Sequence, residues 1–131
     1  VFSTAENVEI IVLNRTNKEA VILGDKDQLL RTFNNLLKNA IEATEGKERC
    51  AIKIKVINDD KNVYVEVEDN GKGIDPRLQD NIFVPNFTTK SSGTGLGLAF
   101  VKQAIENAGG SIEFKSEVNL GTTFYLSFPL V

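Results

Sequence analysis

The sequence predicts an α+β domain in which helices pack on a mainly antiparallel sheet. Its strand patterns come in blocks and do not alternate one by one with helices, which disfavours a doubly wound parallel sheet. Two segments, 25–44 and 98–108, have the apolar spacing of amphipathic helices. The length of 131 residues suits one core, so we expect residues 1–131 to form a single domain of a longer protein.

The first part of the chain predicts a hairpin followed by a helix. Val8–Leu13 and Ala20–Leu23 are short β-branched runs separated by a polar turn, which is typical of a β-hairpin. Asp25 is a suitable N-cap, and apolar residues then recur at the spacing of one buried helical stripe. Gly46 is expected to stop this helix after position 44.

The remaining strands are predicted from alternating apolar and polar side chains, which indicate half-buried strands. An Asp- and Asn-rich turn joins the first two of them and a glycine turn joins the last two, so both pairs are expected to be hairpins. These strands are 51–57, 63–68, 111–115 and 122–128.

Three segments remain between these strands. A short helix is expected at 76–82, and the helix 98–108 should end at the glycine pair that follows it. The stretch 84–97 has few large apolar side chains, several hydroxyls and three glycines, so we expect a mobile loop there.

Composition excludes several classes of function. The net charge of −3 gives no long-range attraction to nucleic acid, so we expect no such partner. No apolar run approaches the roughly 20 residues that span a bilayer, so we expect a cytoplasmic domain without membrane contact, whether or not the full-length protein is anchored elsewhere. The absence of histidine excludes histidine-based catalysis and histidine metal ligands in this chain.

An asparagine-rich helix face is the first candidate site. Asparagine is a mediocre helix former, yet Asn34, Asn35 and Asn39 fall within six positions. Asn35 and Asn39 are one turn apart, with Lys38 beside them. An ordinary solvated face is the usual explanation of such residues. The alternative is an amide oxygen offered to Mg²⁺, with the lysine near phosphates.

A loop directly after a predicted strand is the second candidate. Asp69-Asn70-Gly71-Lys72-Gly73-Ile74 has ordinary turn chemistry. Its glycines also permit a flat ligand to approach the backbone, with Asp69 accepting a hydrogen bond from an exocyclic amine. The motif alone does not decide between these alternatives.

A glycine-rich loop before the second helix is the third candidate. The backbone amides of Gly93-Thr94-Gly95-Leu96-Gly97-Leu98 and the helix N-terminus would form an anion site. The loop lacks the Lys-Ser/Thr ending of a P-loop and does not match the dinucleotide-binding fingerprint. A flexible linker is the alternative, which the following amphipathic helix disfavours.

In this order and spacing the three motifs resemble the ATP-site boxes of the Bergerat-fold superfamily, which includes histidine kinases, DNA gyrase, a heat-shock chaperone and a mismatch-repair ATPase. The resemblance extends from about Asp25 to Pro129, and Asn86 departs from it because the family often has a bulky apolar residue there. The matching segments are 35–39 (N box), 69–73 (G1 box), 82–90 (F box and start of the ATP lid), 93–98 (G2 box) and 121–124 (final strand motif).

The resemblance implies a two-layer α/β sandwich with Mg²⁺ and ATP between the helix 25–44 and the lid. Asn39 would be the metal ligand, Asp69 would accept a hydrogen bond from the adenine amino group, and Thr122 would join the polar network beside the base. The other residues implied in the nucleotide site are Asn35, Lys38, Gly71, Gly73, Ile74, Lys90, Gly93, Gly95, Leu96, Gly97 and Leu98, with Ile41 packing near the base.

By the same resemblance, the chain is the catalytic domain of a two-component sensor histidine kinase. It would transfer the γ-phosphoryl group to a histidine on a separate dimerisation domain, and a response regulator would be an indirect partner. Hydrolytic relatives place a glutamate base where this chain has Asn35, which cannot take a proton. The alternatives are an anti-sigma-factor-type serine kinase, which the lid length and the Phe83/Phe87 pair disfavour, and a nucleotide-binding regulator without transfer activity.

Overall fold

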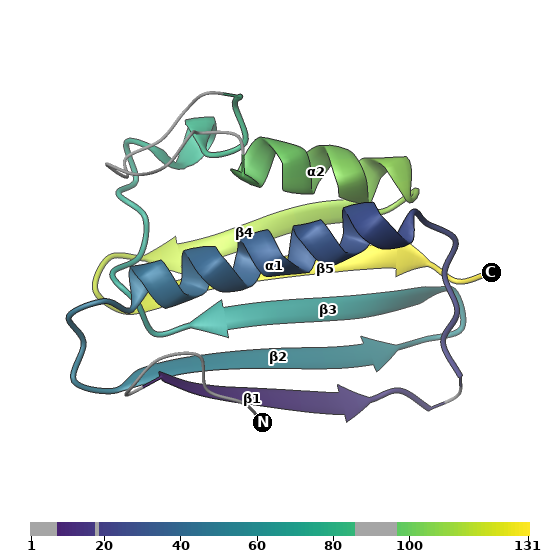
Figure 1. Cartoon of the computed structure of the whole chain (residues 1–131), viewed down its shortest axis with the longest axis horizontal. Helices are drawn as coiled ribbons and strands as arrows, with labels where there is room; N and C mark the ends of the chain where they lie inside the picture. Colours follow the sequence, from purple (N-terminus) through teal and green to yellow (C-terminus); the bar gives the residue numbers. More distant parts are fainter. Residues whose placement is uncertain (1–7, 18, 86–96) are drawn as a thin grey trace.

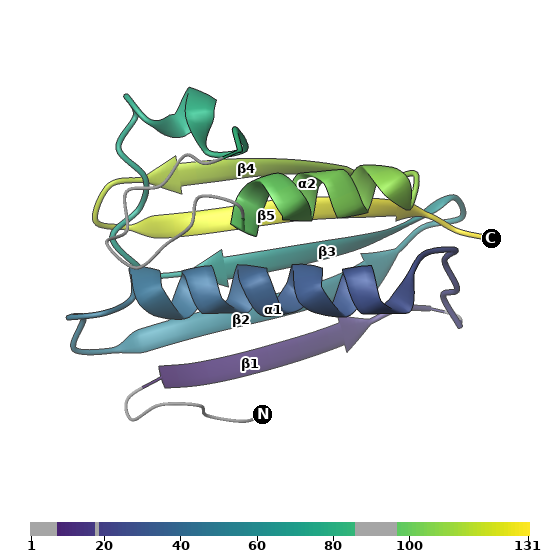
Figure 2. The same ribbon diagram turned by 45° about the horizontal axis from the view of Figure 1, so that its top comes forward.

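The fold is a five-stranded mixed sheet with helices on one side, seen in a computed structural model that describes residues 8–17, 19–85 and 97–131 (Figures 1 and 2). The strands lie in the order β1-β2-β3-β5-β4. The elements are β1 (Val8–Arg15), α1 (Lys26–Ala43), β2 (Cys50–Asn58), β3 (Asn62–Asp69), the short 3₁₀ turn η1 (Gln79–Asn81), α2 (Gly97–Asn107), β4 (Ser111–Glu117) and β5 (Gly121–Pro129).

The pairing of the strands confirms the predicted α+β class. The pairs β2–β3, β3–β5 and β4–β5 are antiparallel, and only the edge strand β1 runs parallel to its neighbour, β2. The two predicted hairpins after residue 50 are therefore present, and the prediction that the sheet is mixed but mainly antiparallel is confirmed.

The hairpin predicted at the start of the chain is wrong. Ala20–Leu23 forms no strand, and β1 pairs with β2 instead. Residues 19–25 lead from β1 to α1, and the Val21 carbonyl accepts a hydrogen bond from the amide of Val131 at 2.9 Å. Ala20 and Ile22 pack against the main core, so their apolar character serves this crossing and not a second strand.

Helix α1 begins and ends as predicted. The Asp25 Oδ1 atom accepts a hydrogen bond from the amide of Gln28 at 3.0 Å, which satisfies a free amide of the first turn. At the other end, Thr44 is the C-cap and Gly46 has a φ of +83°, a value that favours glycine.

The short helix predicted at 76–82 is present only in part, as η1 within a succession of tight turns. The amides of Leu78, Asn81 and Val84 each donate to the carbonyl three residues earlier. Such bonds build 3₁₀ turns, and only Gln79–Asn81 is regular enough to form η1. Residues 86–96, which make up most of the predicted mobile loop, lie outside the described residues.

Both helices pack on the same face of the sheet, where the core lies. The main core joins α1 and α2 to β3 and β5, and a smaller cluster joins α1 to β1 and β2. The opposite face carries the cross-strand ion pairs Lys53–Glu68 and Lys55–Glu66, as expected for a solvated face. Within the described ranges, no helix is long and apolar enough to cross a bilayer.

Candidate functional site

Helix α1 carries the predicted asparagine face. Asn35 and Asn39 are half-buried, whereas Asn34 and Lys38 are exposed. The Asn35 Nδ2 atom donates a hydrogen bond of 3.4 Å to the carbonyl of Gly97, the first residue of α2. The face therefore contacts the start of the second helix and is more than a solvated surface.

Asp69 ends β3 and is only 7% exposed, which makes it the one buried charged side chain of the described residues. Its Oδ1 atom accepts hydrogen bonds from the amides of Gly71 at 2.8 Å and Thr122 at 3.3 Å. Burial raises the pKa of Asp69 above its ordinary value of 3.8, although these two bonds act to lower the pKa. Its Oδ2 atom receives no hydrogen bond from the described residues.

The two glycines of the loop after β3 pack against neighbouring backbone. A Cβ atom at Gly71 would lie 2.5 Å from the carbonyl oxygen of Ala43, which also accepts a hydrogen bond from the amide of Lys72. Gly73 has a φ of +74°, and a Cβ there would overlap the carbonyl of Glu117. The fold itself therefore requires both glycines. Their contact with a base stays a prediction.

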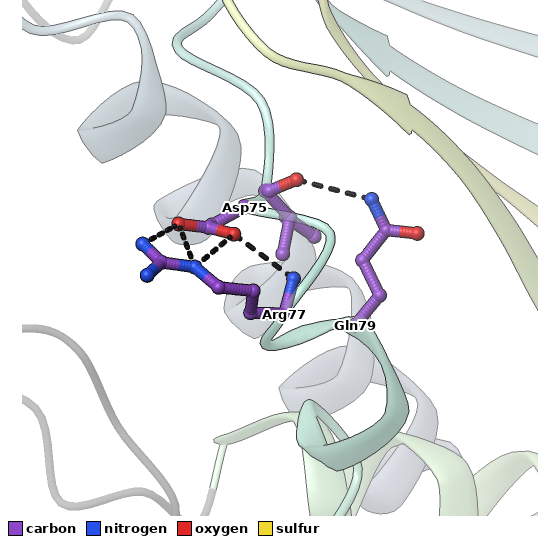
Figure 3. Close-up of polar contacts among 4 residues, drawn as sticks. Asp75, Arg77 and Gln79 are labelled. Carbon is purple, nitrogen blue, oxygen red and sulfur yellow. Dashed lines mark hydrogen bonds and ion pairs between the residues drawn. The ribbon is translucent and has the colours of Figure 1, made fainter.

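Ile74 follows this loop with both backbone polar groups hydrogen-bonded. Its amide donates to Ser116 Oγ at 2.8 Å, and its carbonyl accepts from Gln79 Nε2 at 3.0 Å. Figure 3 shows Gln79 beside an ion pair in which Arg77 Nη2 lies 2.6 Å from Asp75 Oδ2. The hydrogen bonds from Arg77 lower the pKa of Asp75 to about 2. These local contacts hold Ile74 in place.

Phe83, in the segment that resembles the F box, anchors the chain before the predicted lid. Its ring packs edge-on against Phe114 at 5.9 Å and Phe124 at 6.5 Å between centroids. The Lys102 ammonium of α2 lies 5.5 Å from the centre of the same ring. These contacts fix Phe83 to β4, β5 and α2.

Part of the predicted phosphate site cannot be placed. Gly97 begins α2, and Leu98 is half-buried against the main core. The other residues of the predicted glycine loop and lid lie outside the described residues, and their roles stay predictions: Lys90, Gly93, Gly95 and Leu96.

The described site residues lie along α1 and at the end of the sheet where β3 stops. In Figures 1 and 2 the last turn of α1 and the loop after β3 lie at this end, and α2 begins part-way along α1. The bonds described above join them: Lys72 to Ala43, Asp69 to Thr122, and Asn35 to Gly97. The arrangement offers an acceptor to a flat donor-bearing group at Asp69 and a helix N-terminus to an anion at Gly97.

Comparison with known proteins decides the family. Residues 24–131 match the family model described as histidine kinase-, DNA gyrase B-, and HSP90-like ATPase. The chain belongs to this family. It is 41% identical to the sensor histidine kinase ZraS of Salmonella typhimurium over 110 residues, which are 84% of this chain and 23% of that protein.

Solved structures of histidine kinases have the same fold as this ATPase domain. The catalytic domain of histidine kinase ThkA aligns with a TM-score of 0.78 at 35% identity, covering 94% of this chain and 79% of that one. Full-length ShkA, solved in complex with AMPPNP, aligns with a TM-score of 0.79 at 26% identity, over 95% of this chain and 26% of that one. The chain is thus an ATP-binding catalytic domain of the histidine kinase type, and it spans about a quarter of the length of the curated relatives that it matches.

Two residues beside the predicted site were missed by sequence reasoning. Ser116 lies opposite Thr122 in the β4–β5 ladder and bonds both Thr122 and Ile74. The glycine turn at 121 fixes that register, so the sequence held a signal for Ser116. Gln79 had no such signal, because its contact depends on the 3₁₀ turn.

Proposed function

We propose that this domain, in the cytoplasm, transfers the γ-phosphoryl group of Mg·ATP to a histidine on a separate dimerisation domain of the same kinase. A response regulator would then receive the group. One observation supports this proposal most strongly. The asparagine face of α1 contacts the start of α2, and the end of the same helix contacts the loop that follows the buried carboxylate of Asp69.

Asp69 would select the base. A buried carboxylate with one oxygen already occupied by two amides has a fixed orientation, so the other oxygen can meet an exocyclic amine without reorganisation. Thr122 lies directly opposite Asp69 in the β3–β5 ladder, and Ile74 is held beside it by Ser116. Together they would form the wall of the site against which adenine packs.

Asn39 fits a magnesium ligand by its chemistry. Mg²⁺ keeps several waters and takes ligands from substrate phosphates, so a single amide oxygen from the protein is enough. Within the described ranges no three His, Cys, Asp or Glu side chains come together to hold a metal. Bound there, Mg²⁺ would neutralise charge on the β- and γ-phosphates.

Transfer to another domain is favoured over hydrolysis. The chain has no histidine to receive the phosphoryl group. Asn35 occupies the position of the glutamate base in hydrolytic relatives, and its amide donates to Gly97 instead. Phosphoryl transfer needs mainly positioning and charge neutralisation, so the acceptor can come from a partner.

A transfer assay tests the proposal. With γ-labelled Mg·ATP the domain alone should yield no phosphoprotein and little free phosphate. The histidine-bearing domain of the same kinase, added in trans, should acquire an acid-labile, base-stable phosphate. Asn39→Ala should abolish this transfer, whereas Asn34→Ala, at an exposed position of the same helix, should keep it. Steady phosphate release by the domain alone would instead indicate a hydrolase, and acid-stable labelling of a hydroxyl would indicate a serine kinase.

A further inference from the structure

Three neighbouring strands present polar side chains at the same register. Asp69 of β3 lies opposite Thr122 of β5, and Thr122 lies opposite Ser116 of β4. Asp69 and Thr122 are 7% and 5% exposed, so both face the helix-covered side of the sheet. The three side chains form a row at the edge of the nucleotide site, and Ser116 is the member to which no role has been assigned.

The Ser116 hydroxyl has a complete set of hydrogen bonds. It accepts from the Ile74 amide at 2.8 Å, lies 2.8 Å from Thr122 Oγ1, and donates to the Gly121 carbonyl at 3.3 Å. A serine hydroxyl has one proton and two lone pairs. Either hydroxyl could donate in the Ser116–Thr122 bond taken alone. For all three contacts to be hydrogen bonds at once, the Ser116 proton goes to Gly121 and the remaining lone pair of Ser116 accepts the proton of the Thr122 hydroxyl.

This count fixes the polarity of Thr122. With its proton directed at Ser116, Thr122 Oγ1 has only lone pairs left to offer to a ligand. The ionised carboxylate of Asp69 also offers only lone pairs. Toward the 6-substituent of a purine, these two side chains therefore present hydrogen-bond acceptors, which match an amino group and oppose an oxo oxygen.

We propose that Ser116 is a positioning residue that holds Thr122 as an acceptor and thereby sharpens the preference of the site for a 6-aminopurine over a 6-oxopurine. The inference rests on the proposed nucleotide site. Without Ser116, the Thr122 hydroxyl can turn its proton toward the ligand. A 6-oxo group, which accepts hydrogen bonds, then meets a donor where it met a lone pair, and it is rejected less strongly.

A purely structural role for Ser116 predicts a different result. Loss of the hydroxyl also leaves the Ile74 amide without its acceptor, which would loosen the site for every nucleotide. That effect weakens binding of ADP and of inosine diphosphate equally, because both share the ribose and the phosphates. The ratio of the two dissociation constants therefore separates the positioning role from the structural one.

The experiment measures dissociation constants of ADP and inosine diphosphate by calorimetry in Mg²⁺. Ser116→Ala should lower the ratio of the dissociation constant of inosine diphosphate to that of ADP by about threefold or more. This is the change expected for the loss of about one oriented hydrogen bond. Ser111→Ala is the matched control, since Ser111 lies on the same strand with its Oγ 2.8 Å from Ser127 Oγ at the far end of the β4–β5 pair. It should leave the ratio unchanged.

Two more variants keep the inference testable if Ser116→Ala does not fold. Thr122→Val removes the acceptor itself and should narrow the ratio in the same way, whereas Ser116→Thr keeps the hydroxyl and should retain the ratio. Equal losses for both nucleotides in Ser116→Ala, or an unchanged ratio in Thr122→Val, would overturn the inference while leaving the proposed function intact. Failure of the unaltered domain to bind ADP would instead count against the nucleotide site.

Discussion

Thr32 is the residue that most clearly opposes the stability of the fold. It lies in α1 with no exposed surface, and its hydroxyl oxygen is the one buried side-chain nitrogen or oxygen atom in the described part of the chain without a hydrogen-bond partner. Thr32→Val replaces the hydroxyl with a methyl group of similar size and should raise the free energy of unfolding by about 1 kcal/mol. Thr44 is the matched control, because it is equally buried but donates to the Ile41 carbonyl at 2.8 Å.

Urea unfolding of both variants checks this prediction. Thr44→Val should lower the free energy of unfolding by about 1 kcal/mol, since the hydrogen bond is lost. Destabilisation by Thr32→Val would mean that the hydroxyl has a partner in solution.

Asp69 should make stability depend on pH in an unusual direction. Because its pKa is raised in the folded state, its contribution is fully present below the ordinary value of 3.8 and is lost as the pH rises through the folded-state pKa. Asp69→Asn does not titrate. The free energy of unfolding of the unaltered domain, measured relative to that variant, should therefore fall as the pH rises above 3.8.

Asp75 provides a control of opposite sign for this pH dependence. Its pKa is lowered to about 2 by Arg77, so its contribution is constant above the ordinary value of 3.8 and is lost as the pH falls toward 2. Urea unfolding without nucleotide, repeated across acid pH, measures how the free energy of unfolding changes with pH through each of the two carboxyls. If the free energy of unfolding of the unaltered domain, measured relative to Asp69→Asn, instead rose with pH, this result would contradict the buried environment of the Asp69 carboxyl.

At the scale of the elements, substitution of two glycines should have different effects, on packing at Gly71 and on nucleotide binding at Gly97. Gly71 has no room for a Cβ against Ala43, so Gly71→Ala should destabilise the fold. Among the described residues nothing lies within 4 Å of a Cβ at Gly97, and alanine favours a helix over glycine by about 1 kcal/mol. Gly97→Ala should therefore keep or raise stability while it weakens ADP binding, because the methyl group would crowd phosphates at the start of α2.

Thermal unfolding and ADP titration of the two glycine variants check this contrast. If Gly97→Ala binds ADP as tightly as the unaltered domain, the phosphates do not approach the first residue of α2.

The elements that the sequence predicted best carry their own local signals. Helix α1 has an N-cap at Asp25 and a stop at Gly46, and the hairpin β2–β3 has strict alternation and a polar turn. The run Ala20–Leu23 failed because a β-branched segment has the same pattern whether it pairs in a sheet or packs on a core. Its place is set by the parallel pairing of β1 with β2, a contact between distant residues that no local pattern encodes.

For the whole molecule, the candidate site could be predicted only in part. Asp69, Thr122 and Asn39 have residue types and positions that point to a nucleotide, and the structure brings the first two into contact. The register of the β4–β5 turn would have indicated Ser116. The packing role of Gly71 depends on how α1 meets the loop after β3, so residue type alone does not reveal it. The motifs identified the family because their order and spacing along the chain are a consequence of this tertiary arrangement.

Calorimetric titration of ADP in the presence of Mg²⁺ tests most directly whether this end of the sheet is an adenine-nucleotide site. The unaltered domain should bind, and Asp69→Asn should lose about 1–3 kcal/mol of binding free energy, because an amide mismatches the donors around it. Asp60→Asn, the same change in the exposed β2–β3 turn, should bind normally. Equal ADP affinity of the unaltered domain and Asp69→Asn would contradict the proposed site.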